Sequence, residues 1–167
     1  QEQLLYTINN AEDKVILINS DFLPLLASVK DQFPTVKKML LLNDSKEKPE
    51  TSLTLDGEYE ELMQTASDQY EFPDFDEDSM ATIFYTTGTT GQPKGVYFSH
   101  RQLVLHTYSI LGTLCGFNSQ WRISSKDIYM PITPMFHVHA WGIPYLMTLL
   151  GAKQVYPGKY EPKMLLQ

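Results

Sequence analysis

The sequence predicts an α/β fold built on a mainly parallel sheet. One observation is a short, continuous apolar run at 15–18, the pattern of a strand that is buried on both faces. The other is the helical spacing of apolar residues at 3–12, the pattern of a helix with one buried face. Because the two patterns alternate along the chain, strands joined by helices are expected, and that arrangement gives a parallel sheet.

The predicted elements follow one another in a regular order. Helices are expected at 3–12, 23–32 and 59–66, and strands at 15–18, 39–42, 81–85 and 97–98. The polar segment 43–52 is expected to be a surface loop. The stretch 56–78 has ten acidic residues and no Lys or Arg, which indicates a solvated helix face followed by an acidic loop.

No feature separates two domains, so 1–79 is interpreted as an α/β lead-in and 80–167 as the motif-bearing part of one domain.

The composition restricts the classes of function. A net charge of −7 excludes nucleic acid as the main partner, because phosphate backbones are bound by basic faces. The single cysteine, Cys115, forbids an internal disulfide and favours a reducing, cytoplasmic location. No apolar run approaches the roughly 20 residues that span a bilayer, and residues 1–3 lack the pattern of a signal peptide. We therefore expect no transmembrane segment. We also expect that the sequence was cut from a longer protein at Gln1.

One stretch carries the chemistry, Tyr-Thr-Thr-Gly-Thr-Thr-Gly-Gln-Pro-Lys-Gly-Val at 85–96. Its glycines allow positive φ and a close approach of backbone to a ligand. Its threonines and backbone N–H groups supply hydrogen-bond donors, and Lys94 adds a positive charge, so the set suits a cradle for phosphate oxygens. The residues expected to hold a nucleotide are Thr86, Thr87, Gly88, Thr89, Thr90, Gly91 and Lys94.

This loop is not one of the common nucleotide motifs. A Walker loop requires Gly and Lys where Pro93 and Lys94 stand, and the G-x-G-x-x-G dinucleotide pattern is absent. The alternative interpretation is a Gly- and Thr-rich hairpin loop without a ligand. After the loop, Ser99 and Gln102 have the spacing of a capping box, which predicts that a helix begins there.

A second motif, Pro-Ile-Thr-Pro-Met-Phe-His-Val-His-Ala-Trp-Gly, occupies 131–142 and predicts an aromatic-rich turn that leads into a helix. His137 and His139 suggest a metal pair when taken alone. No nearby Cys or carboxylate completes a tetrahedral site, so this interpretation is weak. No function is assigned to His139, and the alternative for Trp141 is an ordinary core aromatic.

The two motifs together resemble one family. The stretch 85–96 matches the phosphate loop of the adenylate-forming superfamily, which contains acyl-CoA synthetases, luciferases and peptide-synthetase adenylation domains. The stretch 131–142 resembles the next motif of the same family. The flanks at 97–101 and 151–158 look like those of bacterial and archaeal medium- and long-chain fatty-acid–CoA ligases. The resemblance implies part of the layered, mainly parallel N-terminal domain of such an enzyme.

The resemblance also implies roles for single residues. The loop would bind ATP, and the Thr86 hydroxyl would help to hold Mg²⁺. Val138 and Trp141 would lie near the nucleotide, and His137 would border the site of the acyl carboxylate. Trp141 matches an aromatic that gates the acyl tunnel in bacterial long-chain fatty-acid ligases. His100 is also typical of the family and is expected to support the loop structurally.

The implied reaction has two steps. A fatty carboxylate attacks the α-phosphate of MgATP to give acyl-adenylate and pyrophosphate, and the thiol of coenzyme A then displaces AMP. The implied partners are fatty acid, ATP and coenzyme A, in a cytoplasmic protein that forms a homodimer. A peripheral membrane contact stays open.

Other parts of the family machinery do not occur in this sequence. A Tyr-Gly-x-Thr-Glu-like segment, the ribose-binding Asp and the C-terminal domain with its catalytic Lys are absent, so no catalytic residue is assigned here. We therefore expect the 167-residue chain to be inactive alone. The alternatives are adenylation of an aryl or short-chain acid, an adenylation domain that serves a carrier protein, and a non-catalytic nucleotide-binding module.

Overall fold

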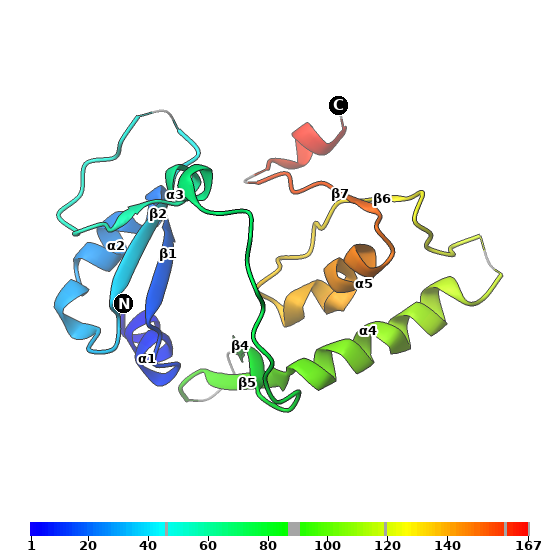
Figure 1. Cartoon of the computed structure of the whole chain (residues 1–167). Helices are drawn as coiled ribbons and strands as arrows, with labels where there is room; N and C mark the ends of the chain where they lie inside the picture. The colour runs from blue at the N-terminus through cyan, green and yellow to red at the C-terminus, as the bar shows by residue number, and fades with distance from the viewer. Residues whose placement is uncertain (46, 87–90, 119, 159, 167) are drawn as a thin grey trace. The chain divides into compact units, whose positions relative to one another are not determined.

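The computed structural model describes residues 1–45, 47–86, 91–118, 120–158 and 160–166 (Figure 1). The chain forms two compact units, Gln1–Asp74 with Tyr85–Gly95 and Phe75–Phe84 with Val96–Gln167. The division passes through two paired strands, β4 (Met80–Thr86) and β5 (Lys94–Ser99), so each strand contributes residues to both units.

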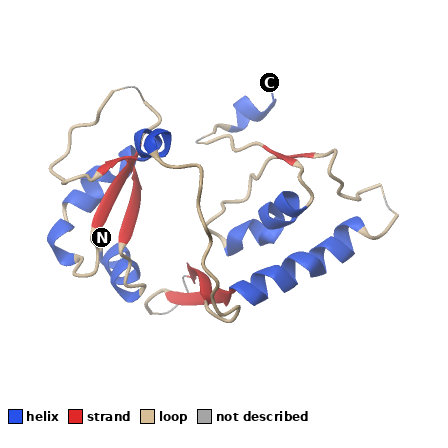
Figure 2. Cartoon of the chain, viewed as in Figure 1, coloured by secondary structure: helices blue, strands red, loops and turns tan. Residues whose placement is uncertain are grey.

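The first unit contains a parallel three-stranded sheet with the order β1-β2-β3 (Figure 2). Its strands are β1 (Val15–Asn19), β2 (Lys38–Leu42) and β3 (Gly57–Glu58), and its helices are α1 (Glu2–Asn10), α2 (Leu23–Ala27) and α3 (Tyr59–Thr65). The α/β class and the parallel pairing are confirmed. The helices predicted at 3–12 and 59–66 and the strands at 15–18 and 39–42 are confirmed as well.

The core of this unit covers one face of β1. Ile18 is 4% exposed and packs in a cluster with residues of α1 and α2, such as Ile8 and Leu23. On the other face, Val15 is 49% and Leu17 is 51% exposed. The prediction that this strand is buried on both faces is therefore wrong for the described chain, because its helices cover only one side.

The helix predicted at 23–32 is shorter than expected. α2 ends at Ala27, and a separate 3₁₀ turn follows at Lys30–Gln32. Between them Val29 has φ −133° and leaves the helical region, which lets its side chain enter the core at 5% exposure. The Ser28 hydroxyl also donates to the Leu25 carbonyl, an interaction that competes with helical bonding. Tertiary burial thus overrides the local helical pattern. A further 3₁₀ turn lies at Ser20–Phe22.

The second unit packs two helices against each other. They are α4 (His100–Cys115) and α5 (Ile143–Leu149), and Leu146 and Met147 of α5 are 0% and 1% exposed. Two short strands, β6 (Ile128–Tyr129) and β7 (Lys153–Gln154), pair in parallel. Shorter 3₁₀ turns occupy Val138–Gly142 and Pro162–Leu166. The strands predicted at 81–85 and 97–98 are confirmed as parts of β4 and β5.

The capping box predicted at the start of α4 is confirmed. The Ser99 hydroxyl accepts from the Gln102 backbone N–H at 3.2 Å, and the Gln102 side chain accepts from the Ser99 backbone N–H at 2.9 Å. Two helix-end donors that would otherwise lack partners are satisfied in this way. No helix within the described ranges has the length and apolar character needed to cross a bilayer.

The preceding acidic segment also holds the start of α4. Arg101 forms an ion pair with Glu77 at 2.5 Å, and the backbone N–H of Arg101 donates to the Glu77 carbonyl at 2.9 Å. The His100 ring lies 4.5 Å from the ring of Phe75, measured between centroids, and the His100 N–H donates to the Ser79 carbonyl. These contacts give His100 a packing role at the end of β5, beside the helix start.

Substitution of Ser99 tests the cap. Ser99→Ala removes one partner of the capping box and should lower the free energy of unfolding by about 1 kcal/mol. The matched control is Ser109→Ala on the exposed face of the same helix, where alanine should leave stability unchanged or raise it slightly. Chemical denaturation measures both. Equal losses in the two variants would show that the box contributes nothing.

Candidate functional site

The predicted phosphate loop begins where β4 ends. Thr86 is the last residue of that strand and its side chain is exposed, as is the side chain of Lys94 at the start of β5. Gly91 has φ +98°, and no atom of the described residues lies within 4 Å of the position that a Cβ would occupy there. The predicted residues Thr87, Gly88, Thr89 and Thr90 lie outside the described residues.

Two described residues of the predicted loop, Gly91 and Lys94, are open to a ligand. The positive φ of Gly91 and the open space beside it allow a ligand to approach the backbone. No acidic side chain in the described ranges forms an ion pair with Lys94, so its charge is available to a ligand. An exposed ammonium group and open backbone donors are the features that phosphate binding uses.

The first residue of the loop motif, Tyr85, is fixed to helix α1. Its hydroxyl donates to the Asn10 side-chain carbonyl at 2.7 Å. Burial, with smaller contributions from Tyr6 and Asp13, raises the pKa of the Tyr85 phenol above its ordinary value. The phenol therefore stays protonated at neutral pH and remains a donor, which anchors the strand end from which the loop leaves.

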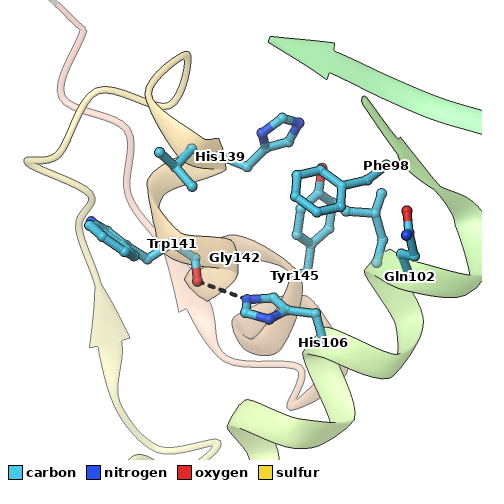
Figure 3. Close-up of a pocket in the computed structure, with 9 residues that line it drawn as sticks. Phe98, Gln102, His106, His139, Trp141, Gly142 and Tyr145 are labelled. Carbon is cyan, nitrogen blue, oxygen red and sulfur yellow. Dashed lines mark hydrogen bonds between the residues drawn. The ribbon is translucent and has the colours of Figure 1, made fainter. Parts of the chain in front are cut away.

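The second unit contains a cavity of about 250 Å³ (Figure 3). Its walls come from the end of β5, one face of α4, the turn at Val138–Gly142 and the start of α5. Of the predicted residues, Val138 and Trp141 line it together. His137, the third residue predicted near the acyl group, is exposed and is not among the described lining residues. The loop residues Thr86, Gly91 and Lys94 belong to the other unit.

The backbone of the turn is left-handed. Val138, His139, Ala140 and Trp141 have φ values of 49°, 52°, 48° and 60°, and Gly142 follows with 75°. For residues with a Cβ this region costs roughly 1–2 kcal/mol each, and it is least common for β-branched residues such as valine. A run of four such residues persists only where the surroundings hold it. We refer to Val138–Gly142 as the left-handed turn.

Helix α4 holds one end of the left-handed turn. The Nε2 atom of His106 lies 3.3 Å from the Trp141 carbonyl oxygen, and Figure 3 shows this hydrogen bond as a dashed line. A Cβ on Gly142 would lie 2.7 Å from the His106 ring. Two features therefore require glycine at this position: the close approach of the His106 ring and the positive φ. The Trp141 side chain is 63% exposed, which is inconsistent with an ordinary core aromatic of this unit.

His139 holds the other part of the turn, and the sequence interpretation missed it. Its Nε2 lies 2.5 Å from the Thr82 hydroxyl of β4, and its Nδ1 is buried without a partner among the described residues. Its ring contacts those of Phe84 and Phe98 at centroid distances of 5.1 and 6.4 Å. Burial lowers the pKa of His139 below its usual value near 6.5. The one signal in the sequence was a polar ring within an apolar run, where burial is costly unless the group is paired.

The two histidines 137 and 139 do not form a metal pair in this arrangement. His139 is hydrogen-bonded to β4, whereas His137 is exposed and its backbone N–H donates to Pro134. Within the ranges that the structure describes, no three or more His, Cys, Asp or Glu side chains are grouped so that they could hold a metal ion.

Comparison with known proteins identifies the family. The family model described as "AMP-binding enzyme" matches residues 1–167, the whole chain. The chain belongs to the AMP-binding enzyme family. It is 42% identical over 158 residues to a 3-methylmercaptopropionyl-CoA ligase from Ruegeria lacuscaerulensis, and 42% identical over 159 residues to a medium-chain-fatty-acid–CoA ligase from Ectopseudomonas oleovorans. Each alignment covers 94% of this chain and 28% of the relative, so the chain spans just over a quarter of their length.

The fold is shared with solved members of the family. The inhibitor-bound N-terminal domain of FACL13 from Mycobacterium tuberculosis matches with a TM-score of 0.75 and 20% identity, covering 98% of this chain and 37% of that domain chain. This chain therefore has the α/β fold of that N-terminal domain. The family resemblance predicted from the two motifs is confirmed by the family match.

The two glycines at 142 and 151 provide a matched test of the turn. Both have positive φ, but a Cβ at Gly142 meets the His106 ring, whereas at Gly151 no atom lies within 4 Å. Each alanine variant should lose about 1–2 kcal/mol of unfolding free energy through backbone strain. Gly142→Ala should lose about 1–3 kcal/mol more through the overlap.

Adding His106→Ala separates the two costs. In the double variant the ring is gone, so the loss caused by Gly142→Ala should fall toward that of Gly151→Ala. Denaturant titrations of the wild type, the two glycine variants, His106→Ala and the double variant give the comparison. A loss at Gly142 that is unchanged without the His106 ring would contradict the close approach.

Proposed function

We propose that this chain is part of an enzyme that activates a fatty acid with ATP, first to acyl-adenylate and then to acyl-CoA. The observation that carries the proposal is the twelve-residue motif at 85–96, which begins in the last two residues of strand β4 and leaves Gly91 and Lys94 open to a ligand. Membership of the AMP-binding family and the acid–CoA ligases among its relatives support it.

The task of the loop in this proposal is electrostatic. Backbone donors beside Gly91, the Thr86–Thr90 hydroxyls and the Lys94 ammonium would hold the phosphates of ATP, and negative charge grows on these as pyrophosphate leaves. Donors fixed in place before the reaction are most effective where charge develops. Mg²⁺ would neutralise part of the phosphate charge, and the exposed Thr86 hydroxyl is the group of this chain that we assign to it.

The cavity of the second unit would receive the acid. Its walls are mainly apolar, which suits an alkyl chain, and Val138 and Trp141, which line the cavity, would border the path of that chain. His137 is proposed to border the carboxylate, and coenzyme A is the thiol that would accept the acyl group. Trp141 is proposed as the gate, since it lines the cavity and is 63% exposed.

The remaining inferences concern the whole protein. A cytoplasmic location agrees with the single cysteine. Assembly as a homodimer and a role in lipid metabolism are proposed from the family resemblance. No residue of this chain is proposed as catalytic, so the 167-residue chain alone should give no turnover.

One relative favours a second candidate substrate. A protein that shares 42% identity is a 3-methylmercaptopropionyl-CoA ligase, whose acid is short. The same chemistry on a short-chain acid is therefore the alternative. Comparing acids of increasing length, together with an aryl acid, as substrates of the full-length protein decides between the two.

Exchange between pyrophosphate and ATP in the presence of acid tests the proposal. The full-length protein should catalyse exchange that depends on a fatty acid. Lys94→Ala should lower kcat/KM for ATP by about 10- to 100-fold, since a charge-assisted hydrogen bond contributes roughly 1.5–3 kcal/mol. Lys126→Ala, at another exposed lysine, is the control and should change it less than twofold. ATP binding without any acid-dependent exchange would instead indicate a non-catalytic nucleotide-binding module.

A further inference from the structure

His139 occupies a position that its role as a turn residue alone does not explain. It comes from the left-handed turn, yet its imidazole is directed away from the Trp141 indole, and the two side chains leave the turn on different sides (Figure 3). Its Nε2 pairs with Thr82, a residue 57 positions earlier in β4. The hydrogen bond therefore joins the turn that lines the cavity to a strand of the sheet.

The tautomer of His139 follows from the burial of its second nitrogen. Nδ1 has no partner among the described residues. If Nδ1 carried the proton, a buried N–H would lack an acceptor, which is rarer and more costly than a buried acceptor without a donor. The favoured form therefore carries its proton on Nε2, and that N–H donates to the Thr82 hydroxyl oxygen. A charged imidazolium would again place an unpaired N–H at Nδ1.

The surroundings of the ring also oppose a charge. The groups around it come from every element packed against it: Thr82 and Phe84 of β4, Phe98 of β5, His106 of α4 and Tyr145 of α5. Of these only His106 and Tyr145 can titrate, and no carboxylate of the described chain is among them. Burial accordingly lowers the pKa of His139.

The geometry points to His139 as a positioning residue: its neutral imidazole donates from Nε2 to the Thr82 hydroxyl and so holds the left-handed turn, with Val138 and Trp141, in place for the acid. That the cavity receives the acid rests on the proposed function, whereas the hydrogen bond between His139 and Thr82 is a feature of the structure. His139 acts through the turn and does not itself touch the reacting atoms. Its loss should therefore weaken binding of the acid more than binding of ATP.

Three variants of the full-length protein separate the bond from simple packing. Thr82→Val keeps the shape of the side chain and removes the hydroxyl, whereas Thr82→Ser keeps the hydroxyl. His139→Gln offers an amide N–H at a similar reach and does not titrate. Thr113→Val, at an exposed hydroxyl on α4, is the matched control.

Steady-state kinetics with the preferred acid give the first readout. Thr82→Val should raise KM for the acid about three- to tenfold, the size expected for one lost buried hydrogen bond, and KM for ATP less than twofold. Thr82→Ser and the Thr113→Val control should stay within about twofold of wild type. Equal increases in both KM values for Thr82→Val, or no recovery in Thr82→Ser, would overturn the positioning role.

The pH dependence gives a readout that packing alone would not change. A lowered pKa keeps the imidazole neutral at neutral pH and lets it protonate only as the pH falls below the usual value of 6.5. KM for the acid should therefore rise in wild type over that acidic range, and His139→Gln should lack this rise. A rise of the same size in His139→Gln would assign the effect to another group and overturn the inference.

Nuclear magnetic resonance of protein labelled with ¹⁵N-histidine tests the bond without any substrate. The imidazole signal that disappears in His139→Gln should show the Nε2–H tautomer and should titrate below pH 6.5. An Nδ1–H tautomer, or titration at or above that pH, would overturn the inference. If no acid supports exchange, the proposed function fails, while this spectrum still decides how His139 is held.

Discussion

The backbone between Val138 and Gly142 has a handedness that its own residues disfavour, and the shape of the cavity depends on its being held. Two histidines hold it from opposite sides. His106 reaches the Trp141 carbonyl from helix α4, and His139 reaches Thr82 in strand β4. The positive φ values would be unfavourable in an isolated peptide. In this unit they place Val138 and Trp141 beside a single cavity, so the site exists because packing outweighs local preference.

The phosphate loop follows a different principle. There the residue itself allows the unusual backbone conformation, because glycine adopts φ +98° at position 91 without the strain that a Cβ would cause. The end of strand β4 before the loop is fixed by a hydrogen bond from the Tyr85 hydroxyl to the Asn10 side chain. In the proposed function, a fixed strand end followed by glycine would let backbone groups approach a phosphate ligand. The loop of the first unit and the cavity of the second unit thus differ: the backbone of Gly91 follows its own preference, whereas the backbone of the left-handed turn is held by neighbouring residues.

The limits of prediction from sequence follow from the same contrast. The strands β1, β2, β4 and β5, the capping box at Ser99 and the loop motif depend on residues close together in the chain, and local pattern was enough to find them. The two-residue strands β3, β6 and β7 were not predicted. The end of α2 at Ala27 and the exposed face of β1 depend on what packs nearby, so local pattern failed there. The left-handed turn and the role of His139 depend on partners 35 and 57 residues earlier, which no window of sequence contains.

Those long separations also bear on the order in which the second unit folds. A contact between residues far apart in sequence must first overcome the entropy of closing the intervening loop. The left-handed turn cannot be held before both α4 and β4 are in place, because each supplies one of the hydrogen bonds that join it to other elements. It should therefore become ordered after those elements, and it should be among the first segments to open when the native protein fluctuates.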